Sequence, residues 1–475
     1  MALDSATGSG MESILTRQKA ANLRDGIPSA AKRIEWLDKA IDLLVTHGDA
    51  FNDAMCDDFG HRSKDQSGFT DIVSSIAALK FAKKHVHKWM QPEKRKVEFP
   101  LGLLGSKAQL QFQPKGVIGV ISPWNFPVNL TFTPLAGVFA AGNRCMIKPS
   151  EFTEATSELM KSVIAQYYDA DEVAVITGGP EVGAEFTKLP FDHILFTGAT
   201  SVAKHVMRAA ADNLVPLTWN LAARARSSLA DMQKAANRIM AGKTLNAGQI
   251  CLAPDYAFVP KEKTAEFTAA ATRAVQTMFP SGLKDNDDYT SIVNQRHFDR
   301  IMSYLEDARA KGAEVIEINP TGDNFSQQPH HKIAPHIIVD PTDDMTVMQD
   351  EIFGPILPIK SYGETADAIA YINANDRSLG LYYFGEDSAE RDTVLNNTTS
   401  GGVTVNDVIF HVAQEDLPFG GVGPSGMGSY HGREGFYEFS HKKSVYTQTG
   451  SEMLAMIRPP YTDSFRKQMK SRLKR

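Results

Sequence analysis

Gly116-Val117-Ile118-Gly119-Val120-Ile121-Ser122-Pro123-Trp124-Asn125-Phe126-Pro127 is the stretch that decides the fold. Its first half is a short apolar run rich in Val and Ile, which predicts a strand. Its second half, with Pro and Asn, is typical of a turn. A Leu- and Ala-rich stretch then predicts a helix, and Cys145-Met146-Ile147 predicts the next strand. Strand, helix and strand in this order indicate a βαβ unit with parallel strands.

The same alternation continues along the chain. We expect strands at residues 173–176 and 193–196, and helices at residues 29–47, 71–90, 153–168 and 202–212. Gly48 is expected to stop the first of these helices. Residues 97–113, which contain Gly102 and Gly105, predict a hairpin. Residues 225–425 repeat the alternation of strands and helices, so the expected fold class is α/β.

Composition limits the classes of partner and compartment. A chain of 475 residues predicts two or more domains. The formal net charge of −6 gives no reason to expect nucleic acid or an anionic membrane as a partner. No segment is apolar for long enough to span a bilayer. The three cysteines have no close pair, which argues against disulfides and suits a reducing, cytoplasmic compartment.

A second stretch carries a candidate nucleophile. Asn246-Ala247-Gly248-Gln249-Ile250-Cys251 ends in one of the three cysteines. Most free cysteines are small buried hydrophobic residues, and from the residue alone that interpretation of Cys251 stays open. As a nucleophile, the thiol would need a base or a lowered pKa for activation.

Five motifs, in this order, resemble those of the aldehyde dehydrogenase superfamily. They are Pro123-Trp124-Asn125-Phe126-Pro127, Phe196-Thr197-Gly198, Asn246-Ala247-Gly248-Gln249-Ile250-Cys251, Glu351-Ile352-Phe353-Gly354-Pro355 and Pro418-Phe419-Gly420-Gly421. The resemblance covers almost the whole chain. Within the branch that oxidises fatty and aromatic aldehydes, residues 246–256 and 421–432 look most like bacterial coniferyl aldehyde dehydrogenases.

The resemblance implies a domain organisation. A discontinuous, Rossmann-like NAD-binding domain is expected at residues 1–96 and 115–222, and an α/β catalytic domain at residues 223–425. A small β element for oligomerisation is expected at residues 97–114 and 426–455, before a tail at 456–475. Exposed edge strands invite pairing, so a homodimer is the expected assembly.

The resemblance also implies a chemistry. A thiol adds to the aldehyde, the adduct expels hydride to the cofactor, and water cleaves the resulting thioester. Cys251 is implied as the nucleophile. The Asn125 amide, with the backbone N–H of Cys251, is implied as the oxyanion donor. Asn220 stands at the position of the family's general-base Glu.

The implied cofactor is NAD. Lys148 and Glu151 are implied to bind the adenosine ribose, where the carboxylate would repel the 2′-phosphate of NADP. The helix after Gly198 is implied to meet the pyrophosphate at its N-terminal N–H groups. The full set of cofactor residues implied is Trp124, Lys148, Glu151, Gly198, Thr200, Leu221, Glu351 and Phe353; no metal is implied.

One segment departs from the family pattern. After Pro216-Leu217-Thr218 the family has Leu-Glu-Leu-Gly-Gly-Lys-Ser-Pro, but this chain reads Trp219-Asn220-Leu221-Ala222-Ala223-Arg224-Ala225-Arg226. An amide cannot accept a proton from water, so Asn220 should slow thioester hydrolysis by roughly 10²–10⁴-fold. Ala222 and Ala223 replace two glycines that let backbone approach the nicotinamide.

Three functions therefore stay open. The leading one is NAD-dependent oxidation of an aromatic or medium-chain aldehyde. The second is a catalytically impaired homologue that keeps the fold and NAD binding, and residues 219–229 favour it. The third is an acyl-transfer or esterase activity through Cys251, which needs a base in the same way.

Our hypothesis for the departing segment is a local frameshift that begins before Trp219, through mutation or a sequencing error. The codons xTG GAA CTT GGC GGC AAG AGC CCG G encode Leu-Glu-Leu-Gly-Gly-Lys-Ser-Pro. Read one base late, they give Trp-Asn-Leu-Ala-Ala-Arg-Ala-Arg, which is what stands at Trp219–Arg226. Sequencing the gene across this segment tests the hypothesis. Codons that hold no family segment in any nearby frame would contradict it.

Overall fold

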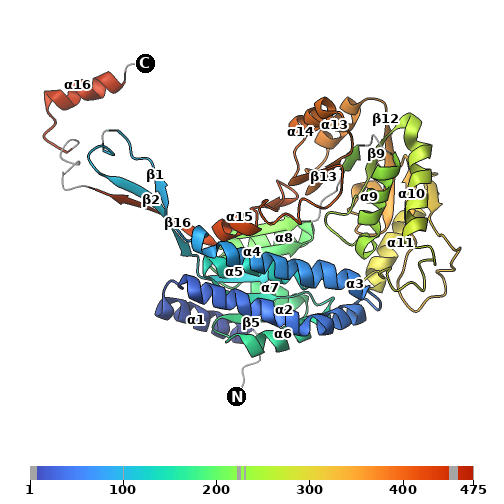
Figure 1. Ribbon diagram of the computed structural model, residues 1–475, viewed down its shortest axis with the longest axis horizontal. Helices are drawn as coiled ribbons and strands as arrows, with labels where there is room; N and C mark the ends of the chain where they lie inside the picture. The colour runs from blue at the N-terminus through green and yellow to red at the C-terminus, as the bar shows by residue number, and fades with distance from the viewer. Residues whose placement is uncertain (1–7, 100, 222–225, 229–231, 449–457, 474–475) are drawn as a thin grey trace. The chain divides into compact units, whose positions relative to one another are not determined.

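The computed structural model describes residues 8–99, 101–221, 226–228, 232–448 and 458–473. The chain divides into two compact units (Figure 1). One consists of Met1–Trp89 and Pro114–Ser440, and the other of Met90–Gln113 and His441–Arg475. Each unit is described by itself.

A six-stranded sheet forms the centre of the first half of the larger unit, with the order β15-β7-β6-β3-β4-β5. Its strands are β3 (Val117–Ile121), β4 (Arg144–Lys148), β5 (Val173–Val175), β6 (His193–Gly198), β7 (Leu217–Leu221) and β15 (Gly426–Met427). All neighbouring pairs are parallel except β7 and β15, which are antiparallel. The predicted parallel sheet and α/β class are confirmed.

Helices pack on this sheet in two groups. Helices α1 (Gly8–Asp25), α7 (Pro180–Thr187) and α8 (Thr200–Ala211) share one buried apolar cluster with the strands. Helix α5 (Asn129–Ala141) contacts β3 and β4, and helices α2 (Ala30–Asp58) and α4 (Ser74–Trp89) pack on α5. Strands with helices packed on them are typical of doubly wound α/β folds.

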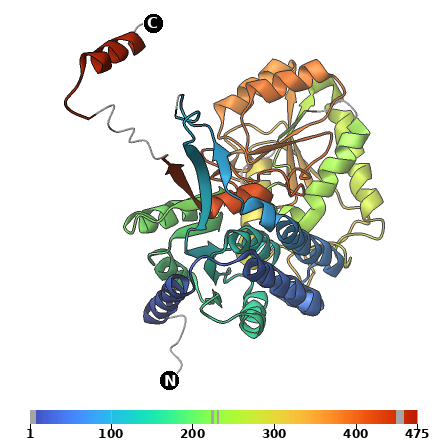
Figure 2. The ribbon, with the colours of Figure 1, turned by 60° about the vertical axis from the view of Figure 1, so that its left-hand side comes forward.

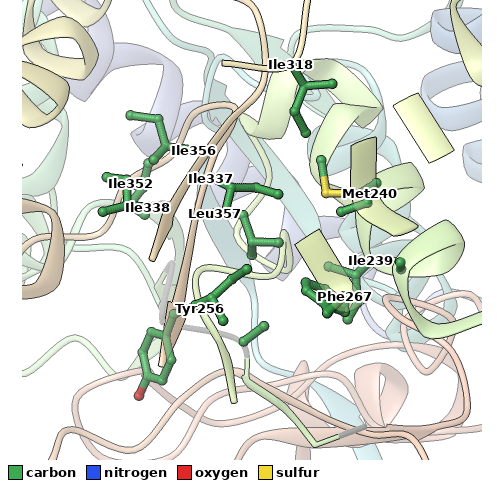
Figure 3. Packing of buried hydrophobic residues seen from close by; sticks show 14 of the residues in the cluster. Ile239, Met240, Tyr256, Phe267, Ile318, Ile337, Ile338, Ile352, Ile356 and Leu357 are labelled. Carbon is green, nitrogen blue, oxygen red and sulfur yellow. The ribbon is translucent and has the colours of Figure 1, made fainter. Parts of the chain in front are cut away.

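A second buried core lies in the later half of the larger unit (Figure 3). It is built on a sheet of order β10-β11-β12-β9. The strands are β9 (Ala257–Pro260), β10 (Glu314–Glu317), β11 (His336–Val339) and β12 (Ile356–Tyr362), and the main helices are α9 (Met232–Thr244), α10 (Thr264–Met278) and α11 (Gln295–Ala310). A separate parallel sheet contains β8 (Arg226–Ser228), β13 (Gly380–Tyr383) and β14 (Gly402–Val405).

Other helices are also described in the larger unit. They are α3 (Lys64–Ser67), the π-helix η1 (Gly68–Val73), α6 (Glu154–Tyr167), η2 (Leu245–Gly248), η3 (Lys261–Lys263), α12 (Thr346–Gln349), α13 (Thr365–Ala374), α14 (Ser388–Asn397) and α15 (Gly432–Glu438).

The smaller unit holds the predicted hairpin (Figure 2). Strands β1 (Glu93–Arg95) and β2 (Lys107–Pro114) pair antiparallel, and β16 (Ser440–Thr447) lies on the other side of β2. The unit ends in helix α16 (Asp463–Arg472), which buries none of its residues. Within the described parts of the chain, no helix is both long and apolar enough to cross a membrane.

Helix α2 corrects one expectation. Gly48 was expected to end this helix, but α2 continues through it to Asp58. The helix extends because Phe51 and Met55 are fully buried in the core. Burying two large side chains outweighs the roughly 1 kcal/mol by which a glycine disfavours a helix interior.

A polar cluster fixes the start of β7. The hydroxyl of Thr218 donates to the carboxylate of Glu438 in α15, and Nε2 of His193 lies 2.8 Å from the same hydroxyl. Nζ of Lys115 lies 3.1 Å from Nδ1 of His193. Burial and Lys115 lower the pKa of His193 to about 3, so the imidazole is neutral at neutral pH. Glu438 of α15 thus links the start of β7 at Thr218 and the start of β6 at His193 to a helix that is distant in sequence.

Candidate functional site

The carboxyl ends of three neighbouring strands bring the implied cofactor residues together. In the register of the sheet, Ile121 at the end of β3 pairs with Lys148 of β4 and with Phe196 of β6. The turn that carries Trp124 and Asn125 follows directly after β3. Ligands of open α/β sheets bind at this edge.

Lys148, at the end of β4, has two polar partners at that edge of the sheet. Its side chain is almost fully buried, and Nζ donates to the carbonyl of Pro149 at 2.7 Å. The carboxylate of Glu151 lies 3.8 Å from Nζ. Burial lowers the pKa of Lys148, and the Glu151 carboxylate opposes that shift. A buried ammonium beside an exposed carboxylate fits a pair of ribose hydroxyl groups, which accept from one group and donate to the other.

Helix α8 begins at Thr200, immediately after Gly198 and Ala199. Its N-cap residue Ala199 makes no side-chain cap hydrogen bond. A Cβ added to Gly198 would lie 2.6 Å from the ring of Phe196, so the backbone comes close to that ring. Uncapped N–H groups at the positive end of a twelve-residue helix suit an anionic pyrophosphate.

Phe353 and Trp124 form an aromatic wall at the site. Their ring centroids are 5.3 Å apart in an edge-to-face arrangement. Phe353 has the left-handed backbone φ of 46°, which is strained for a bulky residue. The guanidinium of Arg300 holds this loop by donating to the carbonyls of Glu351 at 3.2 Å and Ile352 at 3.0 Å.

The nucleophile segment is an unusual turn. Asn246, Ala247 and Gly248 have φ values of 48°, 50° and 74°, three left-handed residues in succession. A Cβ on Gly248 would clash with the carbonyl oxygen of Gly354, so this turn touches the loop that carries Phe353. Backbone strain of this kind is stored at functional sites. Cys251 follows the turn and is half-buried.

The environment of Cys251 keeps it protonated. Burial raises the pKa of its thiol to about 12, and the nearby carboxylate of Glu351 adds to the rise. The backbone N–H groups of Cys251 and Leu252 oppose the shift by donating to the sulfur. The thiol therefore needs a proton acceptor before it can attack.

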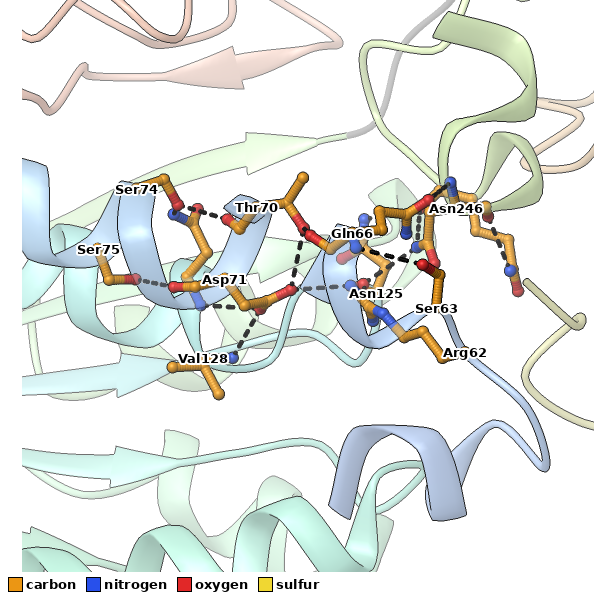
Figure 4. Close-up of polar contacts among 12 residues, drawn as sticks. Arg62, Ser63, Gln66, Thr70, Asp71, Ser74, Ser75, Asn125, Val128 and Asn246 are labelled. Atoms are coloured by element: carbon orange, nitrogen blue, oxygen red, sulfur yellow. Dashed lines mark hydrogen bonds and ion pairs between the residues drawn. The ribbon is translucent and has the colours of Figure 1, made fainter. Parts of the chain in front are cut away.

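Asn125 contacts the nucleophile turn directly (Figure 4). Its buried Nδ2 donates to the carbonyl of Gln249 at 3.1 Å. In return, Nδ2 of Asn246 donates to the carbonyls of Asn125 at 3.1 Å and Gln249 at 3.2 Å. An amide carries two N–H donors, so the second N–H of Asn125 is the one that can serve an oxyanion.

The position of the family's general base is fixed by backbone pairing. Asn220 pairs with Thr197 of β6 and with Gly426 of β15, and Leu221 pairs with Gly198. Both therefore stand on the strand next to β6, whose last residue, Gly198, precedes helix α8. Ala222, Ala223 and Arg224 lie outside the described residues.

Sequence reasoning missed several residues that hold the site. Gln249 belongs to the nucleophile motif, and its Nε2 donates to the carbonyls of Asn246 and Ser291. Arg62, Asp71 and Arg300 carry no motif, so no local signal could have found them. Among the described residues, no group of three or more His, Cys, Asp or Glu side chains is arranged to hold a metal ion.

Lys243 is a further buried group, near the loop that contains Glu351. Its Nζ is 4.0 Å from the carboxylate of Asp255, which accepts from the backbone N–H of Ile352 at 3.2 Å. Burial lowers the pKa of Lys243 to about 8. This lysine thus shares its acidic partner with the loop that carries Phe353.

Comparison with known proteins gives a consistent answer. The family model described as "Aldehyde dehydrogenase family" matches residues 15–445. A probable coniferyl aldehyde dehydrogenase of Caulobacter vibrioides is 60% identical over 98% of this chain and 97% of its own length. A coniferyl aldehyde dehydrogenase of a Pseudomonas species is 52% identical over 95% and 94%.

A solved structure agrees over the whole fold. The substrate-bound AldH of Staphylococcus aureus superposes with a TM-score of 0.90 at 33% identity, covering 98% of this chain and 99% of that one. Together with the family match and the relatives, this shows that the chain belongs to the aldehyde dehydrogenase family of enzymes.

Proposed function

We propose that this chain oxidises an aromatic aldehyde of the coniferyl type to the acid, with NAD as acceptor and Cys251 as nucleophile. The observation that carries the proposal is a hydrogen bond: Nδ2 of Asn125 donates to the carbonyl of Gln249, in the nucleophile segment, at 3.1 Å. This hydrogen bond supports the pairing of the proposed oxyanion donor with the proposed nucleophile, because Cys251 follows Gln249 by two residues. The names of the relatives from Caulobacter and Pseudomonas support the substrate class.

The first step forms a bond between the sulfur of Cys251 and the carbonyl carbon. The thiol proton passes to water or hydroxide from the solvent, which reaches the half-buried Cys251, because a pKa of about 12 leaves few thiolates at neutral pH. The carbonyl oxygen becomes an oxyanion, which Nδ2 of Asn125 and the backbone N–H of Cys251 stabilise. Each such donor contributes about 10²–10³-fold to the rate.

When bound, NAD would supply the hydride acceptor for oxidation of the adduct on Cys251, which would leave a thioester on this residue. Lys148 and Glu151 would hold the adenosine ribose, the N-terminus of α8 the pyrophosphate, and Glu351 the nicotinamide ribose. Trp124 and Phe353 would pack beside the nicotinamide. The Glu151 carboxylate disfavours a 2′-phosphate, so NAD is the proposed acceptor.

Thioester hydrolysis is the step that this chain performs poorly. Water must lose a proton to attack the thioester, and Asn220 offers an amide where a carboxylate would accept that proton. The proposed enzyme therefore completes hydride transfer and then stalls. The alternative is a homologue that binds NAD but does not react, in which residues 219–226 disturb the cofactor edge.

The assembly proposed is a homodimer in the cytoplasm. Strand β16 lies at one edge of its three-stranded sheet, with β2 on its inner side. An open edge can pair with the same strand of a second copy. The three cysteines are free, as a reducing compartment requires.

A single-turnover experiment separates the two functions. We expect mixing with excess NAD and coniferyl aldehyde to give a burst of about one NADH per site, followed by turnover slowed about 10²–10⁴-fold. Asn220→Glu should restore steady turnover without enlarging the burst. The control is Cys251→Ser, which should give no burst. Absence of a burst in the chain with Cys251 intact would support the inactive homologue.

The acidity of Cys251 predicts a steep pH dependence of its alkylation. Below a pKa of about 12 the thiolate fraction rises tenfold per pH unit. Alkylation by iodoacetamide, followed by mass spectrometry of the Cys251 peptide, should therefore accelerate about tenfold per unit between pH 6 and 9. Glu351→Gln removes a negative charge and should speed the reaction at fixed pH, whereas a plateau below pH 8 would contradict the raised pKa.

The choice of NAD predicts the effect of removing one charge. Glu151→Gln deletes the carboxylate that disfavours a 2′-phosphate, so we expect NADPH to bind at least tenfold more tightly, with a smaller loss for NADH. Titration of intrinsic protein fluorescence measures both dissociation constants. Glu154→Gln, one turn away at the start of α6, is the matched control. Equal changes for both cofactors would refute the role of Glu151.

A further inference from the structure

A buried ion pair lies beside the oxyanion turn. Nη2 of Arg62 is 2.8 Å from Oδ2 of Asp71, and both side chains are fully buried. Such a pair contributes little net stability, because desolvating two charges offsets their attraction. Its role therefore lies in what else the two groups bind.

Both members of the pair bind the turn that carries Asn125 (Figure 4). Nη1 of Arg62 donates to the carbonyl of Asn125 at 2.8 Å. Oδ1 of Asp71 accepts from the backbone N–H groups of Val128 at 3.1 Å and Asn129 at 3.0 Å. One charge holds the middle of the turn and the other holds its end.

The pair itself is held rigidly. Asp71 lies in the π-helix η1, a rare conformation that is frequent at functional sites. The hydroxyl of Ser75 donates to the carbonyl of Asp71 at 2.5 Å. The guanidinium of Arg62 lies 4.8 Å from the ring of Phe59 and 5.1 Å from that of Phe126, within cation–π range.

Helix α3, which lies between Arg62 and Asp71 in the sequence, reaches the nucleophile turn. Oε1 of Gln66, four residues after Arg62, accepts from the backbone N–H of Asn246 at 2.9 Å. Nδ2 of Asn246 donates to the carbonyl of Asn125, the atom that Arg62 also binds. One carbonyl oxygen therefore joins the ion pair to both catalytic turns.

We propose that Arg62 and Asp71 are positioning residues, which fix the carbonyl of Asn125 so that its side-chain amide stays aimed at the oxyanion beside Cys251. They touch no reacting atom and act through Asn125 and Asn246. This inference rests on the role of Asn125 in the proposed function, so one of its tests does not depend on turnover.

Hydrogen exchange tests the pair without catalysis. Replacing both charges, Arg62→Met with Asp71→Leu, removes the pair without leaving one charge buried alone. We expect the melting temperature to change by only a few degrees while exchange accelerates in both residues 122–133 and residues 245–251. The matched control is Arg33→Met, since Arg33 is equally buried but donates to the carbonyls of Pro28 and Ala140.

Arg33→Met should leave exchange in residues 245–251 unchanged. Unaltered exchange in both segments of the folded double variant would overturn the proposal. If that variant does not fold, Arg62→Lys replaces it. A lysine can keep the ion pair, but it lacks the planar fork that binds two acceptors at once. Exchange in residues 122–133 should again accelerate, and unaltered exchange there would overturn the proposal.

A double-mutant cycle tests the coupling to Asn125. Alone, Asn125→Ala should slow the NADH burst about 10²–10³-fold, and the Arg62→Met, Asp71→Leu variant should slow it about 10–100-fold with unchanged NADH affinity. If the pair acts through Asn125, adding Asn125→Ala to that variant slows it far less than 10²-fold. Multiplicative effects would overturn the proposal. A chain without any burst refutes the proposed function, while the exchange result still decides the positioning role.

Discussion

The site depends on hydrogen bonds between two turns that are distant in sequence. Nδ2 of Asn125 bonds Gln249, and Nδ2 of Asn246 bonds Asn125, across separations of 124 and 121 residues. One turn follows strand β3 of the parallel sheet, which ends at Ile121, and the other contains three left-handed residues that end at Gly248. Neither turn could make these contacts alone. The geometry of the candidate site therefore depends on both turns together.

Much of the fold could be predicted because its signals are local. The apolar run at Val117–Ile121 and the alternation that follows specify a parallel sheet within short windows of sequence. The length of α2 could not be predicted, since Phe51 and Met55 keep it helical through partners elsewhere in the chain. Tertiary burial overrides local propensity there.

The site divides in the same way. Cys251, Asn125 and Glu351 each lie in a contiguous sequence motif that resembles the family, so the sequence alone identifies them as candidates. Arg62 and Asp71 are single charges in helical surroundings, and their importance comes from the backbone groups of Asn125 and Val128, which only the folded chain brings near. Sequence motifs alone do not predict such long-range contacts.

The start of β7 has a further consequence for this chain in a cell. Thr218 donates a hydrogen bond to Glu438, and β7 pairs with β6 on one side and β15 on the other. The strand is therefore held at its start and along both edges, next to Trp219, where the segment that departs from the family pattern begins. Chaperones and proteases act on the unfolded fraction of a chain, which its folding stability sets. The contact that anchors the start of β7 lies before the departing segment, so a chain altered only after Thr218 keeps that contact and its contribution to folding stability.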